Sequence, residues 1–248
     1  MSDAIAIIPA RLGSTRFPGK VLADATGWPL IRHVYVAAAR AASISRVVVA
    51  TDEERVRDAV RAFGGEAVMT RRDHPNGTSR LAEASAALSL DSEAIVVNVQ
   101  GDEPELDARV IDRVVDALRS VSAPMATAAV PFDPSDDPAN PNIVKVVCRA
   151  DGLAMYFSRS WIPFPRDPAT PPPLRHVGLY AYRRRFLDEY LSLPPAPAEV
   201  AEQLEQLRAL HHGHAIAVAI CDGPAHPGID TPEQYEAFVR RFRSRQGD

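Results

Sequence analysis

Apolar runs and helical patterns alternate along the first half of the chain. Segments rich in Val and Ile at 5–8, 46–50 and 93–99 predict buried strands, and 66–69 predicts a shorter one. The segments between them have apolar residues at helical spacing, first over 29–42 and then in a helix that Thr51 and Glu54 open with capping-box spacing. This β-α-β-α-β order implies an α/β fold with a mostly parallel central sheet flanked by helices.

The second half continues with further helices and strands. We predict helices that start at Asp107 and at Thr231, a helix over 198–212, and strands over 125–131, 143–148, 176–182 and 215–220. In the last helix, Thr231 and Gln234 have capping-box spacing and Pro232 suits the first helical position. Proline is dense between 131 and 197, so within one domain over 1–248 this stretch is expected to form a smaller lobe that serves as substrate lid and dimerisation region.

Composition excludes several classes of protein. The net charge of −4 gives no reason to expect nucleic-acid binding, and no apolar run reaches the length of a membrane span. Cys148 and Cys221 have no metal-binding spacing, and the start of the chain lacks the basic residues of a signal peptide. We therefore expect a cytoplasmic enzyme with no nucleic-acid or membrane partner.

The loop over 9–20 is the first candidate binding element. Pro9 has no N–H for a strand ladder and is expected to end the first strand, and the loop after it carries Arg11, Arg16 and Lys20. A cationic loop at the carboxyl end of a parallel strand suits a ligand with several phosphates. It is not a Walker A loop, because five residues instead of four separate Gly13 from Gly19-Lys20, and Val follows the Lys.

Two acidic corners are candidates for a cation. Asp102 follows the predicted strand 93–99 beside a flexible glycine, and Asp230 lies directly before the cap of the last helix. Magnesium is commonly held by one or two carboxylates together with phosphate oxygens. Asp102 is therefore the first expected metal ligand, while Glu103 is expected to be solvated or to lie behind it.

An Asn-Gly turn precedes another predicted helix. The turn lies at Asn76 and Gly77, with His74 and Arg80 on either side of it, and Thr78 or Ser79 could cap the helix, which is expected to extend to about residue 90. Lys145 lies inside a predicted strand and could face either substrate or solvent.

Several motifs together resemble the sugar cytidylyltransferases, and among them those that use 3-deoxy-D-manno-octulosonate (Kdo). The motifs lie at 7–11, 14–16, 18–20, 76–80, 99–104, 142–147, 157–159, 204–208 and 228–233. The resemblance implies a Rossmann-like nucleotidyltransferase fold and an enzyme that transfers CMP from CTP to the anomeric hydroxyl of Kdo, with release of pyrophosphate. It also implies magnesium as cofactor, a homodimer, and a place in lipopolysaccharide biosynthesis.

The resemblance also implies roles for individual residues. The catalytic residues would be Arg11, Lys20, Asp102 and Asp230, of which Asp102 and Asp230 would share the magnesium ion. The nucleotide would contact Pro9, Ala10, Arg11, Ser14, Lys20, Asn76, Gly77, Arg80 and Gln100. A 2-keto-3-deoxy sugar acid would contact Gln100, Arg159, His176, Tyr180, Glu205 and Gln206.

Two alternatives remain open. One is a cytidylyltransferase for another sugar acid, such as 8-amino-Kdo or a sialic-acid-like sugar, and the other is a nucleotide-binding regulator without catalysis. The linker over 171–175 departs from the family pattern, which leaves the shape of the lid open. Release of pyrophosphate from CTP, measured with and without Kdo, separates these possibilities.

Overall fold

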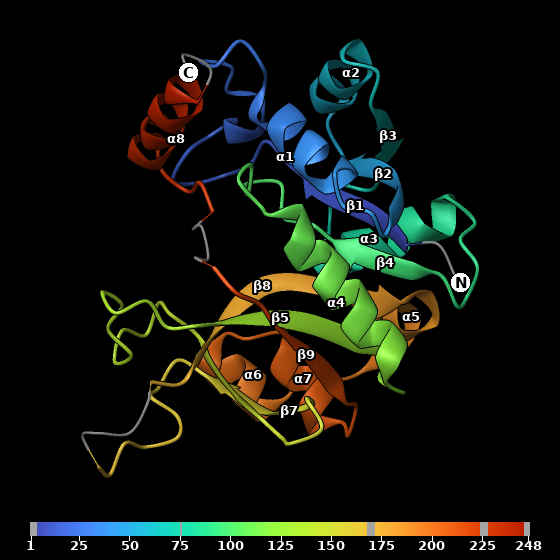
Figure 1. Cartoon of the computed structure of the whole chain (residues 1–248). Helices are drawn as coiled ribbons and strands as arrows, with labels where there is room; N and C mark the ends of the chain where they lie inside the picture. Colours follow the sequence, from blue (N-terminus) through green and yellow to red (C-terminus); the bar gives the residue numbers. More distant parts are fainter. Residues whose placement is uncertain (1–3, 75, 168–171, 224–227, 246–248) are drawn as a thin grey trace. The chain divides into compact units, whose positions relative to one another are not determined.

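The computed structural model of the chain describes residues 4–74, 76–167, 172–223 and 228–245. It contains two compact units, the first formed by residues 1–108 and 226–248 and the second by residues 109–225 (Figure 1). Among the described residues, none of the helices combines the length and the apolar character needed to cross a bilayer.

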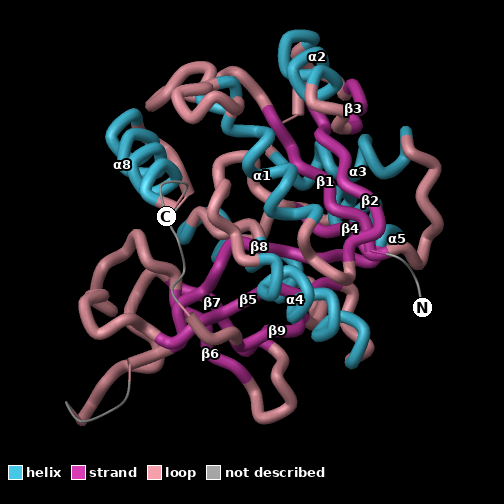
Figure 2. The backbone as a smooth tube through the Cα atoms, turned by 45° about the horizontal axis from the view of Figure 1, so that its top comes forward, coloured by secondary structure: helices cyan, strands magenta, loops and turns pink. Residues whose placement is uncertain are grey.

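The first unit contains a parallel sheet. Its strands are β1 (Ala4–Ala10), β2 (Ile44–Thr51), β3 (Glu66–Met69) and β4 (Ile95–Asn98), in the order β3-β2-β1-β4 (Figure 2). The predicted parallel β-α-β-α-β arrangement is confirmed. Pro9 does not end β1, because the strand continues to Ala10, which pairs with Thr51. A proline is tolerated so close to a strand end because little of the ladder depends on its missing N–H.

The strand order defines a topological switch point in this sheet. The chain passes from β1 through α1 (Leu30–Ala39) to β2, and through α2 (Glu54–Ala62) to β3. It then returns through α3 (Gly77–Ala87) to β4, on the other side of β1. Right-handed crossovers in opposite directions place α3 on the face opposite to α1 and α2. The direction of winding therefore changes between β1 and β4, and the carboxyl ends of the strands at such a switch point are where open α/β sheets bind ligands.

Helix caps confirm one of the predicted starts and correct two. In α8 (Pro232–Ser244), Thr231 and Gln234 form the predicted capping box. In α2 the predicted box is wrong, because Thr51 is the last residue of β2 and its Oγ1 accepts from the Glu53 N–H, at 3.2 Å, so that Glu53 becomes the N-cap. In α3 the cap is Asn76, whose Oδ1 accepts from Ser79 N at 2.9 Å, and not Thr78 or Ser79.

The second unit contains mixed strand pairing. It begins with α4 (Ala108–Ser120), and its central strand β5 (Met125–Pro131) pairs parallel with β9 (Ile216–Ile220) and antiparallel with β8 (Leu174–Arg183). The strand β6 (Lys145–Cys148) pairs antiparallel with one end of β8 and with β7 (Ala154–Ser158), a strand that the sequence pattern did not predict.

The predicted single helix over 198–212 is wrong. The chain instead forms α6 (Pro197–Glu202) and α7 (Gln206–His211) after α5 (Arg184–Ser192), and Gln203 between them has a left-handed φ of 53°. Arg159 donates from Nε to the Glu202 carbonyl at 2.7 Å and from Nη2 to the Gln203 carbonyl at 3.5 Å. A side chain from outside the helix therefore satisfies carbonyls that a continuous helix would have used.

Candidate functional site

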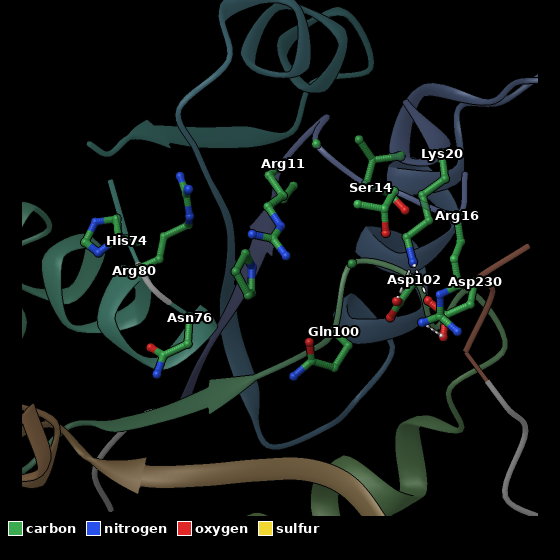
Figure 3. Close-up of a pocket in the computed structure, with 17 residues that line it drawn as sticks. Arg11, Ser14, Arg16, Lys20, His74, Asn76, Arg80, Gln100, Asp102 and Asp230 are labelled. Atoms are coloured by element: carbon green, nitrogen blue, oxygen red, sulfur yellow. Dashed lines mark hydrogen bonds and ion pairs between the residues drawn. The ribbon is translucent and has the colours of Figure 1, made fainter. Parts of the chain in front are cut away.

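A pocket of about 330 Å³ lies at the switch point of the first unit (Figure 3). It is lined by the loop after β1, the residues after β4, the start of α3, and Asp230. The structure thus brings together every residue predicted to contact the nucleotide and both predicted metal ligands, namely Pro9, Ala10, Arg11, Ser14, Lys20, Asn76, Gly77, Arg80, Gln100, Asp102 and Asp230.

Backbone hydrogen bonds shape the loop after β1. The Leu12 carbonyl accepts from Ser14 N at 2.9 Å and from Gly19 N at 3.0 Å, which closes the loop on itself. Gly19 has a φ of 72°, a conformation that favours glycine, and it starts the short 3-10 helix η1 (Lys20–Leu22). The loop therefore delivers Lys20 from a fixed turn.

Close backbone contacts bring the acidic corners to this loop. A Cβ atom at Gly101 would lie 2.9 Å from the Pro9 carbonyl, so only glycine lets the chain after β4 pass β1 so closely. The Ile229 N–H donates to the Asp102 carbonyl at 2.8 Å, and Gln234 Oε1 accepts from Asp230 N at 2.7 Å. Asp102 and Asp230 are thus positioned through hydrogen bonds of their backbone groups, which leaves their carboxylate oxygens available for other contacts.

The ammonium of Lys20 lies between the two carboxylates. Its Nζ is 2.7 Å from Asp102 Oδ2, 3.1 Å from Asp230 Oδ1 and 2.8 Å from the Ile229 carbonyl (Figure 3). Arg16 Nη2 is 2.9 Å from the other Asp230 oxygen. Carboxylates that are far apart in the sequence therefore share one cation, and that cation is a side chain of the protein itself.

This set of oxygens fits a magnesium ion. Two carboxylates and a carbonyl are hard ligands, and magnesium commonly takes only one or two carboxylates from a protein. The Lys20 ammonium among these oxygens is a stand-in for a bound cation. Within the described ranges no cluster of three or more His, Cys, Asp or Glu could hold a metal, so further ligands would have to come from substrate or water.

Glu103 is half-buried, which disagrees with a fully solvated side chain and agrees with the other expectation, a position behind Asp102. Burial raises the pKa of its carboxyl group to about 8, and the charge of the neighbouring Asp102 contributes in the same direction. Both effects favour the neutral, protonated form of Glu103 beside the two aspartates.

The start of α3 forms another part of the pocket wall, where Figure 3 shows His74, Asn76 and Arg80. Arg80 is buried, and its Nη1 lies 2.6 Å from Thr70 Oγ1 and 2.8 Å from Asp52 Oδ1. The His74 ring contacts Glu83 through Nε2 and Ser79 through Nδ1. These side chains are held in place by their neighbours before any ligand arrives.

The remaining predicted residues lie in the second unit, where Arg159 is bound to backbone carbonyls. Its Nη1 donates to the Pro141 carbonyl at 2.9 Å, in addition to the bonds of its Nε and Nη2 to Glu202 and Gln203. Lys145 is fully buried, and its ammonium donates to the carbonyls of Asn140 at 3.1 Å, Ile143 at 2.7 Å and Arg159. These contacts disagree with both roles that the sequence left open for Lys145, facing substrate and facing solvent. Instead, the Lys145 side chain connects the loop before β6 to Arg159.

The adjacent residues Glu205 and Gln206 differ in environment. Glu205 is exposed, whereas Gln206 is only 4% exposed and its Nε2 has no hydrogen-bond partner in the part of the chain that the structure describes. Buried donors are almost always paired, so an unpaired amide is a candidate contact for a ligand oxygen.

His176 and Tyr180 lie on β8, next to a residue that the sequence reasoning missed. Thr127 of β5 is fully buried and its hydroxyl contacts the His176 ring. Its signal in the sequence is weak: it is the only polar residue in the apolar strand over 125–131. Glu202 was also missed; its carboxylate accepts from Ser158 Oγ and from Arg159 N.

Comparison with proteins of known sequence places these features in a family. The family model described as Cytidylyltransferase matches residues 5–216. A 3-deoxy-manno-octulosonate cytidylyltransferase of Syntrophobacter fumaroxidans is 52% identical over 95% of both chains. The protein of that name from Photobacterium profundum is 49% identical over 93% of this chain and 95% of its own.

Comparison with solved structures gives the same assignment. A CMP:2-keto-3-deoxy-manno-octonic acid synthetase complexed with CTP aligns with a TM-score of 0.92 and 42% identity, over 98% of this chain and all of that chain. A cytidylyltransferase from Leptospira borgpetersenii, at 18% identity and a TM-score of 0.61 over 96% of this chain and 85% of its own, shares the fold. The predicted nucleotidyltransferase fold is confirmed, and the chain belongs to the cytidylyltransferase family, together with the 3-deoxy-manno-octulosonate cytidylyltransferases.

Proposed function

We propose that this chain is an enzyme that transfers CMP from CTP to the anomeric hydroxyl of Kdo and releases pyrophosphate. The observation that carries the proposal is the convergence of Lys20, Asp102 and Asp230 in one pocket at the switch point of a parallel sheet. It is supported by relatives about 50% identical that are named for this reaction and by the similarity to a synthetase complexed with CTP.

The reaction exchanges one phosphorus–oxygen bond for another. The anomeric oxygen of the sugar loses its proton and bonds to the α-phosphorus of CTP, while the bond to the β-phosphate oxygen opposite to it breaks. Reactions of this kind depend chiefly on positioning and on neutralising the charge of the phosphates. The protein therefore has to supply cations along the triphosphate and a fixed site for each reactant.

The loop after β1 would receive the triphosphate. Arg11 lines the pocket and makes no ion pair with another described residue. Arg16 also lines the pocket, and its largely exposed guanidinium side chain pairs with Asp230. Asn76, Gly77 and Arg80 at the start of α3 would contact the cytosine ring. Because Arg80 is already held by Asp52 and Thr70, it would keep its place when the nucleotide binds.

Asp102 and Asp230 would hold magnesium. When bound there, the ion supplies positive charge to the phosphates of CTP. Lys20 has to release both carboxylates for this, and its ammonium then becomes available to pair with a phosphate. The same side chain thus keeps the acidic corners together in the free protein and neutralises the nucleotide in the complex.

The sugar acid is assigned to Arg159, His176, Tyr180, Glu205 and Gln206, together with Gln100 of the pocket. The resemblance is the basis for these contacts, and the unpaired amide of Gln206 agrees with a hydroxyl or carboxylate as ligand. A homodimer and a role in lipopolysaccharide synthesis remain predictions from the resemblance, and a cytoplasmic location remains a prediction from the composition.

The experiment is a measurement of pyrophosphate release from CTP with magnesium, in the presence and absence of Kdo. We expect release that depends on Kdo, with CMP-Kdo as the second product. If release requires 8-amino-Kdo or a sialic acid instead of Kdo, that sugar acid is the acceptor and the assignment of Kdo is wrong. If no sugar acid supports release, the proposed activity is wrong.

A further inference from the structure

A break in strand register brings a threonine hydroxyl to the edge of the His176 ring, at Nε2. Along the β5–β8 pair, Thr127 lies opposite Tyr180 but the next residue, Ala128, lies opposite Val177. Gly178 and Leu179 of β8 therefore have no partner of their own on β5 and form a bulge, a feature that often redirects side chains next to active sites. Thr127 is 0% exposed, so its hydroxyl has to find its hydrogen bonds within the protein.

Three acceptor or donor atoms surround the single hydroxyl of Thr127. Its Oγ1 lies 2.9 Å from His176 Nε2, 2.8 Å from the Leu179 carbonyl and 3.2 Å from the Val177 carbonyl. A hydroxyl has one proton to donate, and carbonyl oxygens can only accept. If that proton pointed to the imidazole, two oxygen atoms would face the Thr127 oxygen at these short distances with no proton between them.

Counting donors therefore determines the state of the imidazole. The Thr127 proton points to the carbonyls, and Oγ1 accepts a hydrogen bond from a proton on Nε2 of His176. The ring also lies against Phe157 and Tyr180, with centroids 5.0 Å and 5.5 Å away. Burial lowers the pKa of His176 to about 3, so the ring is neutral and its other nitrogen, Nδ1, carries no proton.

We propose that Thr127 is a positioning residue that holds His176 as the Nε2–H tautomer, so that Nδ1 accepts a hydrogen bond from a hydroxyl group of the sugar acid. The inference rests on the proposed function for the identity of this ligand. It also assigns the direction of the bond: His176 recognises a hydroxyl donor and has no proton to offer to a carboxylate or a keto oxygen.

The tautomer is measurable without substrate. Long-range ¹H–¹⁵N correlation spectra of the free full-length protein separate protonated from unprotonated ring nitrogens. We expect a proton on Nε2 of His176 in the wild type and in Thr127→Ser, which keeps the hydroxyl. Thr127→Val, which has a similar shape but no hydroxyl, is expected to shift the ring towards the Nδ1–H tautomer.

Steady-state kinetics connects the tautomer to recognition. Loss of one hydrogen bond between neutral groups corresponds to a rise of about three- to tenfold in the KM for Kdo in Thr127→Val. The KM for CTP is expected to stay unchanged, and Thr127→Ser is expected to restore the wild-type KM for Kdo. A general loss of packing would instead lower the melting temperature and alter both constants.

Distinct results would overturn the inference. A proton on Nδ1 in the wild type would refute the donor count whether or not Thr127→Val folds. An unchanged KM for Kdo in a folded Thr127→Val whose tautomer has shifted would refute the role in recognition. Failure of the wild type to form CMP-Kdo would instead contradict the proposed function, and the spectra of the free protein would still test the tautomer.

Discussion

At the scale of single residues, a lysine ammonium between two carboxylates determines the electrostatics of the pocket. The side chain of Lys20 is 12% exposed, and those of Asp102 and Asp230 are 28% and 38% exposed. Carboxylates directed at one point repel each other unless a cation lies between them. Lys20 therefore stabilises the acidic corners in the free protein, at a position that a metal ion would otherwise take.

Asp102→Asn is expected to lower kcat at least about 100-fold, because a metal-held phosphate contributes several kcal/mol of charge stabilisation. The fold should persist, since the contact of residue 102 with Ile229 uses its backbone carbonyl. Turnover and thermal unfolding would be measured together, with Asp116→Asn on the exposed side of α4 as control. Near-normal turnover in Asp102→Asn would remove Asp102 from the metal site.

Lys20→Met is expected to increase the affinity for Mn²⁺ in the absence of CTP at least about tenfold, since two charges near 4 Å interact by ~1–4 kcal/mol. The same change should raise the KM for CTP. Electron paramagnetic resonance of free Mn²⁺ gives the affinity. Arg16→Met is the matched comparison and should change the affinity less, because the Arg16 side chain is 66% exposed and its ion pair is therefore weaker. Equal affinities in wild type and Lys20→Met would show that the ammonium does not compete with the metal.

At the scale of elements, the packing of α8 determines where Asp230 lies, because the helix begins two residues later. Phe238 and Phe242 of α8 lie against the His33 ring of α1, with centroids 5.1 Å and 4.7 Å away. His33 Nε2 also lies 2.7 Å from Thr26 Oγ1. A histidine thus occupies a position in an aromatic cluster where only the neutral ring is well accommodated.

This cluster predicts a pH dependence of stability. Burial, with a smaller contribution from Arg32, lowers the pKa of His33 to about 4 in the folded protein, below the ordinary value near 6.5 of the unfolded chain. The unfolded state therefore binds the proton more readily, so this contribution to stability is complete above pH ~6.5, declines between ~6.5 and ~4, and is constant below.

Urea unfolding at pH 7 and pH 4.5 would test this dependence. Trp28 lies 5.3 Å from His33 and reports on the cluster once Trp161 is replaced by Phe. His33→Phe should lose less free energy of unfolding than the parent between the two pH values. Since the low pKa of His176 affects both proteins equally, an identical loss in both would exclude His33 as the cause.

In β6, the buried Lys145 predicts an effect confined to the second unit. Lys145→Met would leave three carbonyl groups without their charged donor, and we expect it to lower the free energy of unfolding by about 2–3 kcal/mol. The KM for CTP should stay unchanged. Arg149→Met, at an exposed position just after the same strand, is the control. An unfolding midpoint like that of the wild type would show that water replaces these bonds.

Periodicity predicted most of these elements but not the break between α6 and α7. The residues over 198–212 favour one continuous helix, and the break depends on Arg159, which is distant in sequence and binds the carbonyls at Glu202 and Gln203. The predicted cap of α2 was wrong for a similar reason, because Thr51 pairs with a neighbouring strand as the last residue of β2. A local sequence pattern contains no information about a hydrogen-bond partner from elsewhere in the chain.

At the scale of the whole molecule, strand order brings distant segments of the first unit together. The sequence pattern predicted a parallel sheet but not the order of its strands. The observed order, β3-β2-β1-β4, places the loop after β1 beside the turn at Asp102. Motifs identified both loops and Asp230 as candidates. They could not show that Lys20 joins the two carboxylates or that Thr127 meets His176, because these contacts form only when the sheets assemble.

The proposed mechanism depends on one divalent ion that Asp102 and Asp230 would hold at the phosphates of CTP. The most direct test is anomalous diffraction from crystals grown with CTP and Mn²⁺. We expect one anomalous peak bonded to oxygens of both carboxylates and to the nucleotide, with the Lys20 ammonium moved to a phosphate. A manganese peak that contacts neither aspartate, with Lys20 still between the carboxylates while CTP is bound, would contradict this mechanism.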